Sequence, residues 1–152
     1  MLKKLLFFLL LNFLALGIGS FFTADGVASM WYQNLHKAPW TPPGWVFGFM
    51  WTSIMILFSL YLADLSSKKQ FAGTNRLLYL IQWLLNVLWN PVFFYFHWTF
   101  VGLLIISGLL ITVLIVLQRN RVIMGWKSIL VFPYALWLLI ATSLNAYILF
   151  YN

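Results

Sequence analysis

Long apolar runs, separated by short polar segments, dominate the hydropathy pattern of the chain. The runs cover residues 5–22, 44–63, 77–96, 100–117 and 128–150. A helix needs about 20 mostly apolar residues to cross the hydrocarbon core of a bilayer. The pattern therefore predicts an all-α polytopic membrane protein, a bundle of five transmembrane helices that forms a single domain over residues 1–152.

Composition supports this class and excludes others. The chain is 64% hydrophobic and 7% charged, with a mean hydropathy of +0.95, which is too apolar for a water-soluble core of this size. The first run follows Lys3 and Lys4, as in a secretory signal peptide, but at about 18 residues it is long enough to span, and we interpret it as the first transmembrane helix. The absence of cysteine excludes disulfides, thiolate metal sites and a cysteine nucleophile.

The basic residues predict the orientation in the membrane. The net charge is +7, and the cations form short clusters between apolar runs, which is typical of topology signals and not of nucleic-acid binding. One side of the predicted bundle holds only Lys37. The opposite side holds Lys3, Lys4, Lys68, Lys69, Arg76, Arg119, Arg121 and Lys127. By the positive-inside rule, the amino terminus is cytoplasmic and the carboxyl terminus lies outside, in a membrane that we expect to be a bacterial cytoplasmic membrane.

Residues 31–43, here named the cover segment, concentrate tryptophan and proline on the outer side. Pro39, Pro42 and Pro43 exclude a helix through Thr41, because proline lacks a backbone donor and favours an extended conformation in the residue before it. The second transmembrane helix is therefore predicted to begin at Pro43 or Gly44. We expect the cover segment to act as a lid and the start of that helix to form a wall beneath it.

Polar residues inside the apolar runs indicate where the bundle interior lies, since each is costly in lipid. Gln82, Asn86 and Asn90 recur every four residues in the third run and so form one stripe, which Pro91 is expected to bend. The fifth run repeats the spacing with Pro133, Trp137, Ala141 and Asn145. Two interpretations stay open at this point: the amides tie helices together, or they line a pocket.

Depth along the helices favours a pocket. At a rise of about 1.5 Å per residue, Trp51 and Trp89 lie about 10 Å below the outer helix ends, Asn86 and Ala141 about 15 Å, and Trp137 about 20 Å. Aromatic rings, an amide and a small residue thus come to similar levels beneath the cover segment. Such walls suit a flat hydrophobic ligand.

Four motifs carry a family resemblance over essentially the whole chain. They read W-Y-x-x-L-x-K at 31–37, W-x-P-P-G-x-x-F at 40–47, L-N-x-x-W-x-x-x-F-F at 85–94 and P-Y-x-x-W-x-x-x-A-T-x-L-N at 133–145. This set closely resembles the TspO and peripheral benzodiazepine receptor family, also known as tryptophan-rich sensory proteins and translocator proteins. The family usually has Lys-Pro-x-Trp, where this chain has Lys37-Ala38-Pro39-Trp40, so the path near Ala38 is expected to differ.

The resemblance implies a ligand and a set of ligand-binding residues. It implies a five-helix bundle, commonly a homodimer in the lipid bilayer, that binds porphyrins such as protoporphyrin IX or haem and, in some members, sterols and benzodiazepine-site compounds. No resident cofactor or metal is expected. Carried over position by position, the ligand-lining residues are Tyr32, Pro42, Trp51, Asn86, Trp137 and Ala141. Two further candidates are Trp40, which lies in the cover segment, and Trp89, which lies at the same depth as Trp51.

Three functions remain open. The first is a membrane receptor or sensor that binds porphyrin, with a role in tetrapyrrole handling or stress regulation. The second is an enzyme that degrades protoporphyrin in light, because Trp51 and Trp137 match the pair that the resemblance associates with that reaction as catalytic residues. The third is a transporter of porphyrins or sterols, against which the chain shows no internal repeat and no intramembrane charge.

Overall fold

A computed structural model describes residues 1–152 and contains helices only. Five of the helices are long α-helices, and one is a short α-helix of 5 residues. The other two, at helix junctions, are a π-helical turn and a 3₁₀ helix. In chain order they are α1 (Leu2–Ala28), α2 (Met30–Asn34), α3 (Gly44–Ser67), α4 (Gly73–Asn90), η1 (Pro91–Tyr95), α5 (Thr99–Met124), η2 (Gly125–Val131) and α6 (Phe132–Tyr151).

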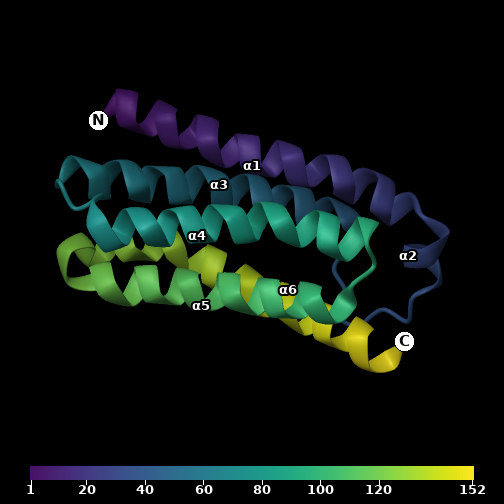
Figure 1. The fold of residues 1–152 in the computed structure, drawn as a ribbon. Coiled ribbons are helices and arrows are strands. Elements are labelled where there is room, and N and C mark those ends of the chain that lie inside the picture. Colours follow the sequence, from purple (N-terminus) through teal and green to yellow (C-terminus); the bar gives the residue numbers. More distant parts are fainter.

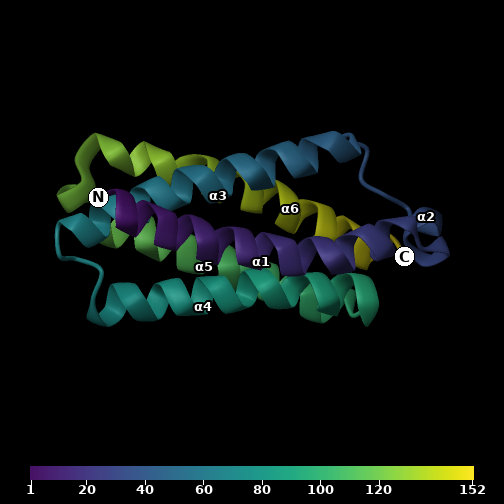
Figure 2. The same ribbon diagram turned by 90° about the horizontal axis from the view of Figure 1, so that it is seen from above.

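The long helices form an elongated bundle in which each runs antiparallel to the next (Figure 1). Helix α1 packs against α3 and α4, α4 packs against α5, and α5 packs against α6. The start of α1 lies at one end of the bundle, together with the α3–α4 and α5–α6 connections. Helix α2 and the end of α6 lie at the opposite end (Figure 2). We call these the packed end and the cavity end, for reasons given below.

The cover segment follows the prediction in part. Helix α3 begins at Gly44, directly after Pro43 in an extended conformation, which confirms the predicted start. The prediction of a loop throughout was wrong for the first residues, which form α2. The Ser29 hydroxyl caps this short helix by accepting a hydrogen bond from the Tyr32 N–H at 3.2 Å, a local signal that the proline argument did not consider.

Pro91 changes the helix type, as expected for a residue without a backbone donor. Helix α4 gives way at Pro91 to a π-helical turn, in which the Phe96 N–H bonds to the Pro91 carbonyl at 3.0 Å. Such wide turns occur often at functional sites. The turn brings Phe93 and Phe94 into the bundle interior, where both are buried.

The predicted polar connection between the last two apolar runs is helical. Helix α5 continues to Met124, and η2 then reverses the chain through Gly125, whose φ of 55° is open to glycine. Four helical stretches are long and apolar enough to cross a membrane, and the last of them, Thr99–Tyr151, contains both α5 and α6. The helices exceed the predicted apolar runs because polar residues at membrane surfaces can continue a helix.

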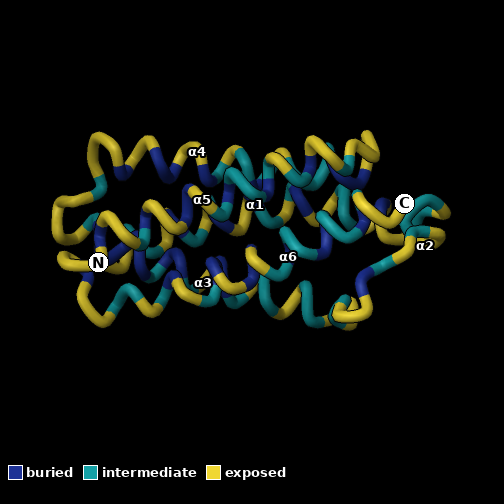
Figure 3. The backbone as a smooth tube through the Cα atoms, turned by 90° about the horizontal axis from the view of Figure 1, so that it is seen from below, coloured by how far each residue is buried: buried dark blue, intermediate teal, exposed yellow.

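The larger hydrophobic core cluster fills the packed end and extends to Trp137 and Ala141 beside the cavity. Figure 3 marks the buried positions along the helices. Phe8, Phe58, Tyr61, Leu62 and Val113 are almost completely buried at the packed end. Large apolar side chains also cover much of the outer surface of the long helices, which is unfavourable in water and favourable in lipid.

Buried polar side chains join neighbouring helices at the packed end. Asn12 donates to the Ser59 hydroxyl at 2.8 Å and accepts from the Tyr79 hydroxyl at 3.0 Å, which joins α1 to α3 and α4. Asn75 and Asn120 exchange two hydrogen bonds at 2.9 and 3.1 Å between α4 and α5. Amides thus tie neighbouring helices together at this end, although they are not the amides of the stripe Gln82, Asn86 and Asn90.

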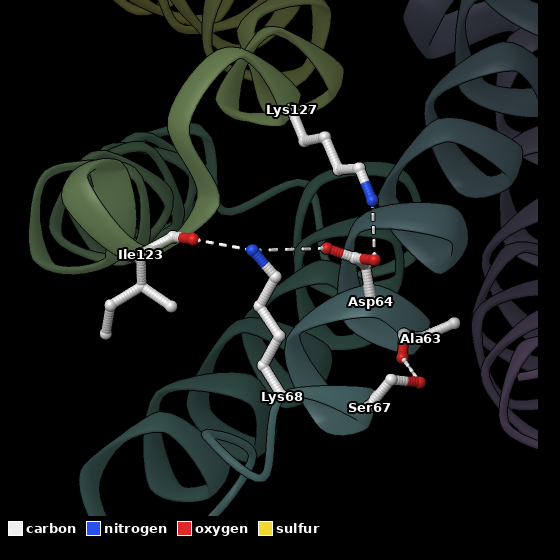
Figure 4. A network of polar contacts seen from close by, with 6 residues as sticks. All are labelled: Ala63, Asp64, Ser67, Lys68, Ile123 and Lys127. Carbon is white, nitrogen blue, oxygen red and sulfur yellow. Dashed lines mark hydrogen bonds and ion pairs between the residues drawn. The ribbon is translucent and has the colours of Figure 1, made fainter.

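An ion-pair network closes the packed end (Figure 4). The Asp64 carboxylate accepts a hydrogen bond from Lys127 at 2.7 Å and lies 3.8 Å from the Lys68 ammonium group. Lys68 also donates to the Ile123 carbonyl at 2.7 Å. Three charged side chains thus connect the end of α3 to α5 and η2.

Candidate functional site

A cavity of about 520 Å³ lies at the cavity end, between the helices and beneath the cover segment. This volume is within the usual range for small-molecule sites. Apolar and aromatic side chains form most of its wall, with a few amides and hydroxyls and a single charged group. Helices α1, α2, α3, α4, η1 and α6 and the cover segment all contribute lining residues.

Aromatic rings form the deep part of the wall. Phe47 meets Trp137 edge to face with ring centres 5.2 Å apart, and Trp51 meets Tyr134 in the same way at 6.0 Å. Trp137 is only 2% exposed, and its indole N–H has no hydrogen-bond partner. These rings come from α3 and α6, so the two helices fix the deep wall by packing indole against phenyl and phenol.

The α4 and η1 side of the cavity is also aromatic. Trp89 stacks on Phe93 with ring centres 5.2 Å apart and meets Phe94 edge to face at 5.7 Å. The Trp89 indole donates to the Asn145 side-chain oxygen at 3.1 Å, which fixes its orientation against α6. The flat faces in the wall are therefore held by contacts within the protein.

The amides of the predicted stripe have different roles. Gln82 donates to the Tyr134 hydroxyl at 2.9 Å and does not line the cavity. Asn90 accepts from the Thr23 hydroxyl at 2.8 Å and donates to the Asn86 carbonyl at 3.1 Å. The Asn86 side chain lines the cavity and makes no hydrogen bond within the protein. Asn86 is thus the amide that is free to bond to a bound molecule.

Helix α1 supplies a wall that the sequence reasoning missed. Its cavity-lining residues are mostly small: Ala15, Leu16, Gly19, Ser20, Thr23, Ala24 and Val27. A Cβ atom at Gly19 would lie 2.6 Å from the Asn90 amide nitrogen, so glycine allows the close approach of α1 and α4. The recurrence of Ala15, Gly19 and Thr23 every four residues was the available signal.

The mouth of the cavity carries one cation. The Lys37 ammonium group lies 4.8 Å from the centre of the Tyr32 ring and donates to the Gln33 carbonyl at 3.3 Å. Both side chains line the cavity, together with Pro42 and Thr41. Burial raises the pKa of the Tyr32 phenol above its usual value of 10.0, so this hydroxyl stays neutral. No carboxylate lines the cavity, and its mouth is therefore electropositive.

All of the predicted site residues except Trp40 line this one cavity. They are Tyr32, Pro42, Trp51, Asn86, Trp89, Trp137 and Ala141. Trp40 points elsewhere: it is 54% exposed, its indole donates to the Ser143 hydroxyl at 3.1 Å, and its ring packs against Tyr147. Trp40 was predicted to bind ligand, but its ring packs against α6 and does not line the cavity.

The residue types present limit the chemistry. The two acidic residues, Asp25 and Asp64, lie towards opposite ends of the bundle and neither lines the cavity. His97 stacks on Trp31 with ring centres 4.0 Å apart, and no group of three His, Asp or Glu side chains has a metal-binding arrangement. The cavity can bind an apolar molecule with hydrogen-bonding or anionic groups, but it holds no acid–base pair.

Known proteins of one family resemble this chain over most of its length. The sequence profile of the TspO/MBR family matches residues 7–151. The tryptophan-rich sensory protein of Cereibacter sphaeroides is 34% identical over 115 residues, which cover 76% of this chain and 72% of that protein. The tryptophan-rich protein TspO of Chlorobaculum tepidum is 34% identical over 143 residues, which cover 91% and 90% of the two chains.

The similarity extends to animals. The human translocator protein is 31% identical over 141 residues, which cover 84% of this chain and 78% of that protein. The matched region includes every helix that contributes to the cavity. Together with the long apolar helices, these matches identify a multi-pass membrane protein. The chain belongs to the TspO/MBR family.

Proposed function

We propose that the protein is a membrane receptor or sensor that binds a porphyrin, protoporphyrin IX or haem, in the cavity beneath the cover segment. Membership of a family whose relatives are named sensory and translocator proteins supports the receptor role. The porphyrin ring is flat and apolar and carries carboxylates at one edge. It suits a cavity with aromatic walls at its deep end and one cation at its mouth.

The observation that carries the proposal is the placement of Lys37. It is the single charged residue that lines the cavity, and it lies at the mouth above the Tyr32 ring. A porphyrin inserted ring first presents its propionates to this ammonium group. The free Asn86 amide deeper in the wall provides a hydrogen bond to a ring substituent or a pyrrole N–H.

The membrane arrangement belongs to the same proposal. Helices α5 and α6 are antiparallel neighbours within the stretch Thr99–Tyr151, so we propose five crossings in total (Figure 1). Most of the cations lie at the packed end, which by the positive-inside rule supports a cytoplasmic packed end with the cover segment outside. We propose a homodimer in the bilayer, as the family resemblance implies.

A titration of detergent-purified protein with protoporphyrin IX in the dark tests this function. Tryptophan fluorescence and the porphyrin absorption band report binding, because Trp51, Trp89 and Trp137 line the cavity. Saturable quenching with a red-shifted absorption band supports the proposal. Quenching that rises linearly with porphyrin, as it does with protein-free detergent micelles, contradicts it.

A second candidate function is light-dependent degradation of protoporphyrin. The observation in its favour is that Trp51 and Trp137 line the same cavity from α3 and α6. An excited porphyrin can take one electron from a contacting indole, which leaves a porphyrin radical anion and an indole radical cation; dioxygen is then the oxidant for ring opening. The double variant Trp51→Phe and Trp137→Phe tests this step. If product bands under light form as fast as in the unmodified protein, the enzymatic function is excluded.

A further inference from the structure

The Asn152 side chain ties the cover segment to α6. The His36 N–H donates to the Asn152 side-chain oxygen at 2.8 Å, and the Asn152 side-chain nitrogen donates to the His36 carbonyl at 3.2 Å. The same nitrogen donates to the Ile148 carbonyl at 3.0 Å, one turn earlier in α6. One amide thus pairs with both backbone groups of a cover residue while it is held in place by its own helix. Figures 1 and 2 show α2 and the end of α6 at the same end of the bundle.

Trp40 makes a second tie, four residues along the cover segment. Its indole donates to the Ser143 hydroxyl at 3.1 Å, and its ring meets Tyr147 edge to face at 5.5 Å. Tyr147 in turn stacks on Tyr151 with ring centres 4.2 Å apart. A tryptophan predicted to bind ligand is instead fastened to the outer face of α6.

The two tied residues, His36 and Trp40, are direct neighbours in sequence of the cover-segment residues that roof the cavity. Lys37 lies between them, and Thr41 and Pro42 follow directly after Trp40; all three line the cavity. The residues between α2 and α3 form no helix or strand, and they make few hydrogen bonds to neighbouring residues. Thr41 bonds to the Ala38 carbonyl, the Leu35 N–H donates to the Tyr32 carbonyl of α2 at 3.4 Å, and Lys37 donates to the Gln33 carbonyl of α2. Leu35 packs against the buried cluster of Phe93, Phe94 and Ile148. Beyond Leu35, the roof is held down by the burial of Ala38, by the contacts of Lys37 with α2 and by the two ties to α6.

The neighbouring parts of the roof are anchored more firmly. Helix α2 packs Trp31 on His97 and Phe93, and Tyr32 on Phe94, with ring centres 4.0, 5.6 and 5.5 Å apart. On the other side, α3 begins at Gly44 and continues into the core. The segment that can lift from the cavity without unfolding a helix or exposing Leu35 is therefore residues 36–43.

We propose that Asn152 and Trp40 form a latch that keeps residues 36–43 closed, so that breaking the latch opens the cavity to the aqueous side and speeds exchange of its contents. Both are positioning residues, since neither lines the cavity. The exchange of porphyrin rests on the proposed function, whereas the opening motion does not. Because the latch contacts no ligand, its loss speeds entry and release alike and leaves the dissociation constant unchanged.

The first test measures opening without any porphyrin. The chain has no cysteine, so Ala141→Cys places a single thiol in the cavity wall. The probe is the labelling rate with a membrane-impermeant maleimide, for protein in nanodiscs. Adding Asn152→Ala to this background removes the paired hydrogen bonds, and we expect labelling to accelerate about fivefold. Asn34→Ala is the matched control, since Asn34 is exposed beside the same segment and its side chain makes no hydrogen bond.

Two further variants define the latch. Trp40→Phe keeps a ring against Tyr147 and loses the bond to Ser143, and we expect about a threefold acceleration. Asn152→Asp keeps the acceptor for the His36 N–H and loses the donor, so its rate is expected to lie between those of the unmodified protein and Asn152→Ala. Equal labelling rates in Asn152→Ala and Asn34→Ala overturn the latch, and show that reagents reach the cavity by another route.

The second test uses protoporphyrin IX in stopped-flow quenching. Association and dissociation rates are both expected to rise about fivefold in Asn152→Ala, with a dissociation constant within twofold of the unmodified value. A rise in dissociation alone means that Asn152 stabilises the bound state directly, and overturns the latch. If no porphyrin binds to any variant while labelling still accelerates, the proposed function fails and the latch stands.

Discussion

At the packed end of the bundle the helices surround a continuous core, whereas at the cavity end the same helices surround a space of about 520 Å³. The difference does not come from a change in polarity, since asparagine and tyrosine occur in both halves. At the packed end the Asn12 and Asn120 amides bond across helices, while at the cavity end Asn86 is left free. The packed end is filled by side-chain contacts, whereas the cavity end keeps an open space and one unpaired amide that are available for binding.

Small residues account for much of this contrast. On α1, Phe8 fills the core at the packed end, and two turns later Ala15 and Gly19 leave room for the cavity. On α6, Tyr134 fills the interior at the deep end, while Ala141 lies at the level of the space. Small residues at Ala15 and Gly19 of α1 and at Ala141 of α6 thus contribute to the space of the cavity.

The largest effect on stability is expected at the packed end, from Asn12→Leu. The change leaves the buried Tyr79 hydroxyl without its acceptor and removes the bond to Ser59, so the free energy of unfolding should fall by about 2 kcal/mol. Thermal unfolding in detergent measures this. Asn86→Leu is the matched change at the cavity end and should leave the stability within about 0.5 kcal/mol, because no protein bond is lost. Equal losses in the two variants would contradict the division into two halves.

A smaller loss is expected from the ion pair at the packed end. Asp64→Asn removes the partner of Lys127 and Lys68, and unfolding should become easier by about 1 kcal/mol, since Lys127 is partly exposed. The loss should shrink at high ionic strength. Porphyrin affinity in this variant should equal that of the unmodified protein, and a large drop would show that the two ends are coupled.

How far these features follow from the sequence can be judged residue by residue. The start of α3 at Gly44 was predictable because prolines act on the local backbone. The convergence of Trp51, Asn86 and Ala141 was predictable because helix rise converts sequence position into depth. The α1 wall was missed, since Ala15 and Gly19 carry no chemistry and are recognised as a wall only once the neighbouring helices are in place.

The wrong predictions concern features that depend on contacts between segments far apart in the sequence or on local helix geometry. The position of Trp40 depends on a hydroxyl of α6 that lies 103 residues away in sequence, and no local pattern reports such a contact. Residues 118–127 were predicted as a polar connection between two helices, because their polar composition was taken to end a helix. They instead continue α5 and begin η2. In the stripe of Gln82, Asn86 and Asn90, spacing gave the shared face but could not show which amide stays unpaired.

At the mouth of the cavity, Lys37→Gln should weaken porphyrin binding about fivefold, because it removes the ion pair between the ammonium group and a porphyrin propionate. The effect should diminish as salt is raised, and it should be absent for a porphyrin whose propionates are esterified. Unchanged affinity for the free acid would show that Lys37 does not bind the porphyrin, and it would not affect the proposed role of the aromatic walls.

The smallest effect is expected from Tyr32 at high pH. Burial raises the pKa of this phenol in the folded protein, so folding disfavours its ionisation, and the associated loss of stability sets in only as the pH rises above the ordinary value of 10.0. Tyr32→Phe should therefore reduce the fall in melting temperature above that pH and change nothing near pH 7. Melting curves recorded as a function of pH measure the difference.

The most direct test of the central claim, that the cavity is the porphyrin site, is a dark titration of Ala141→Phe with protoporphyrin IX. Ala141 lines the cavity and is buried, so a phenyl ring at this position occupies the space that the ligand needs. Leu139→Phe adds a ring at an exposed position of the same helix and serves as the control. The account predicts that binding weakens at least about 100-fold in Ala141→Phe, the loss of several packed ring contacts, with normal thermal stability and with unchanged binding in the control. Equal affinity in both variants would place the porphyrin outside this cavity and contradict the account.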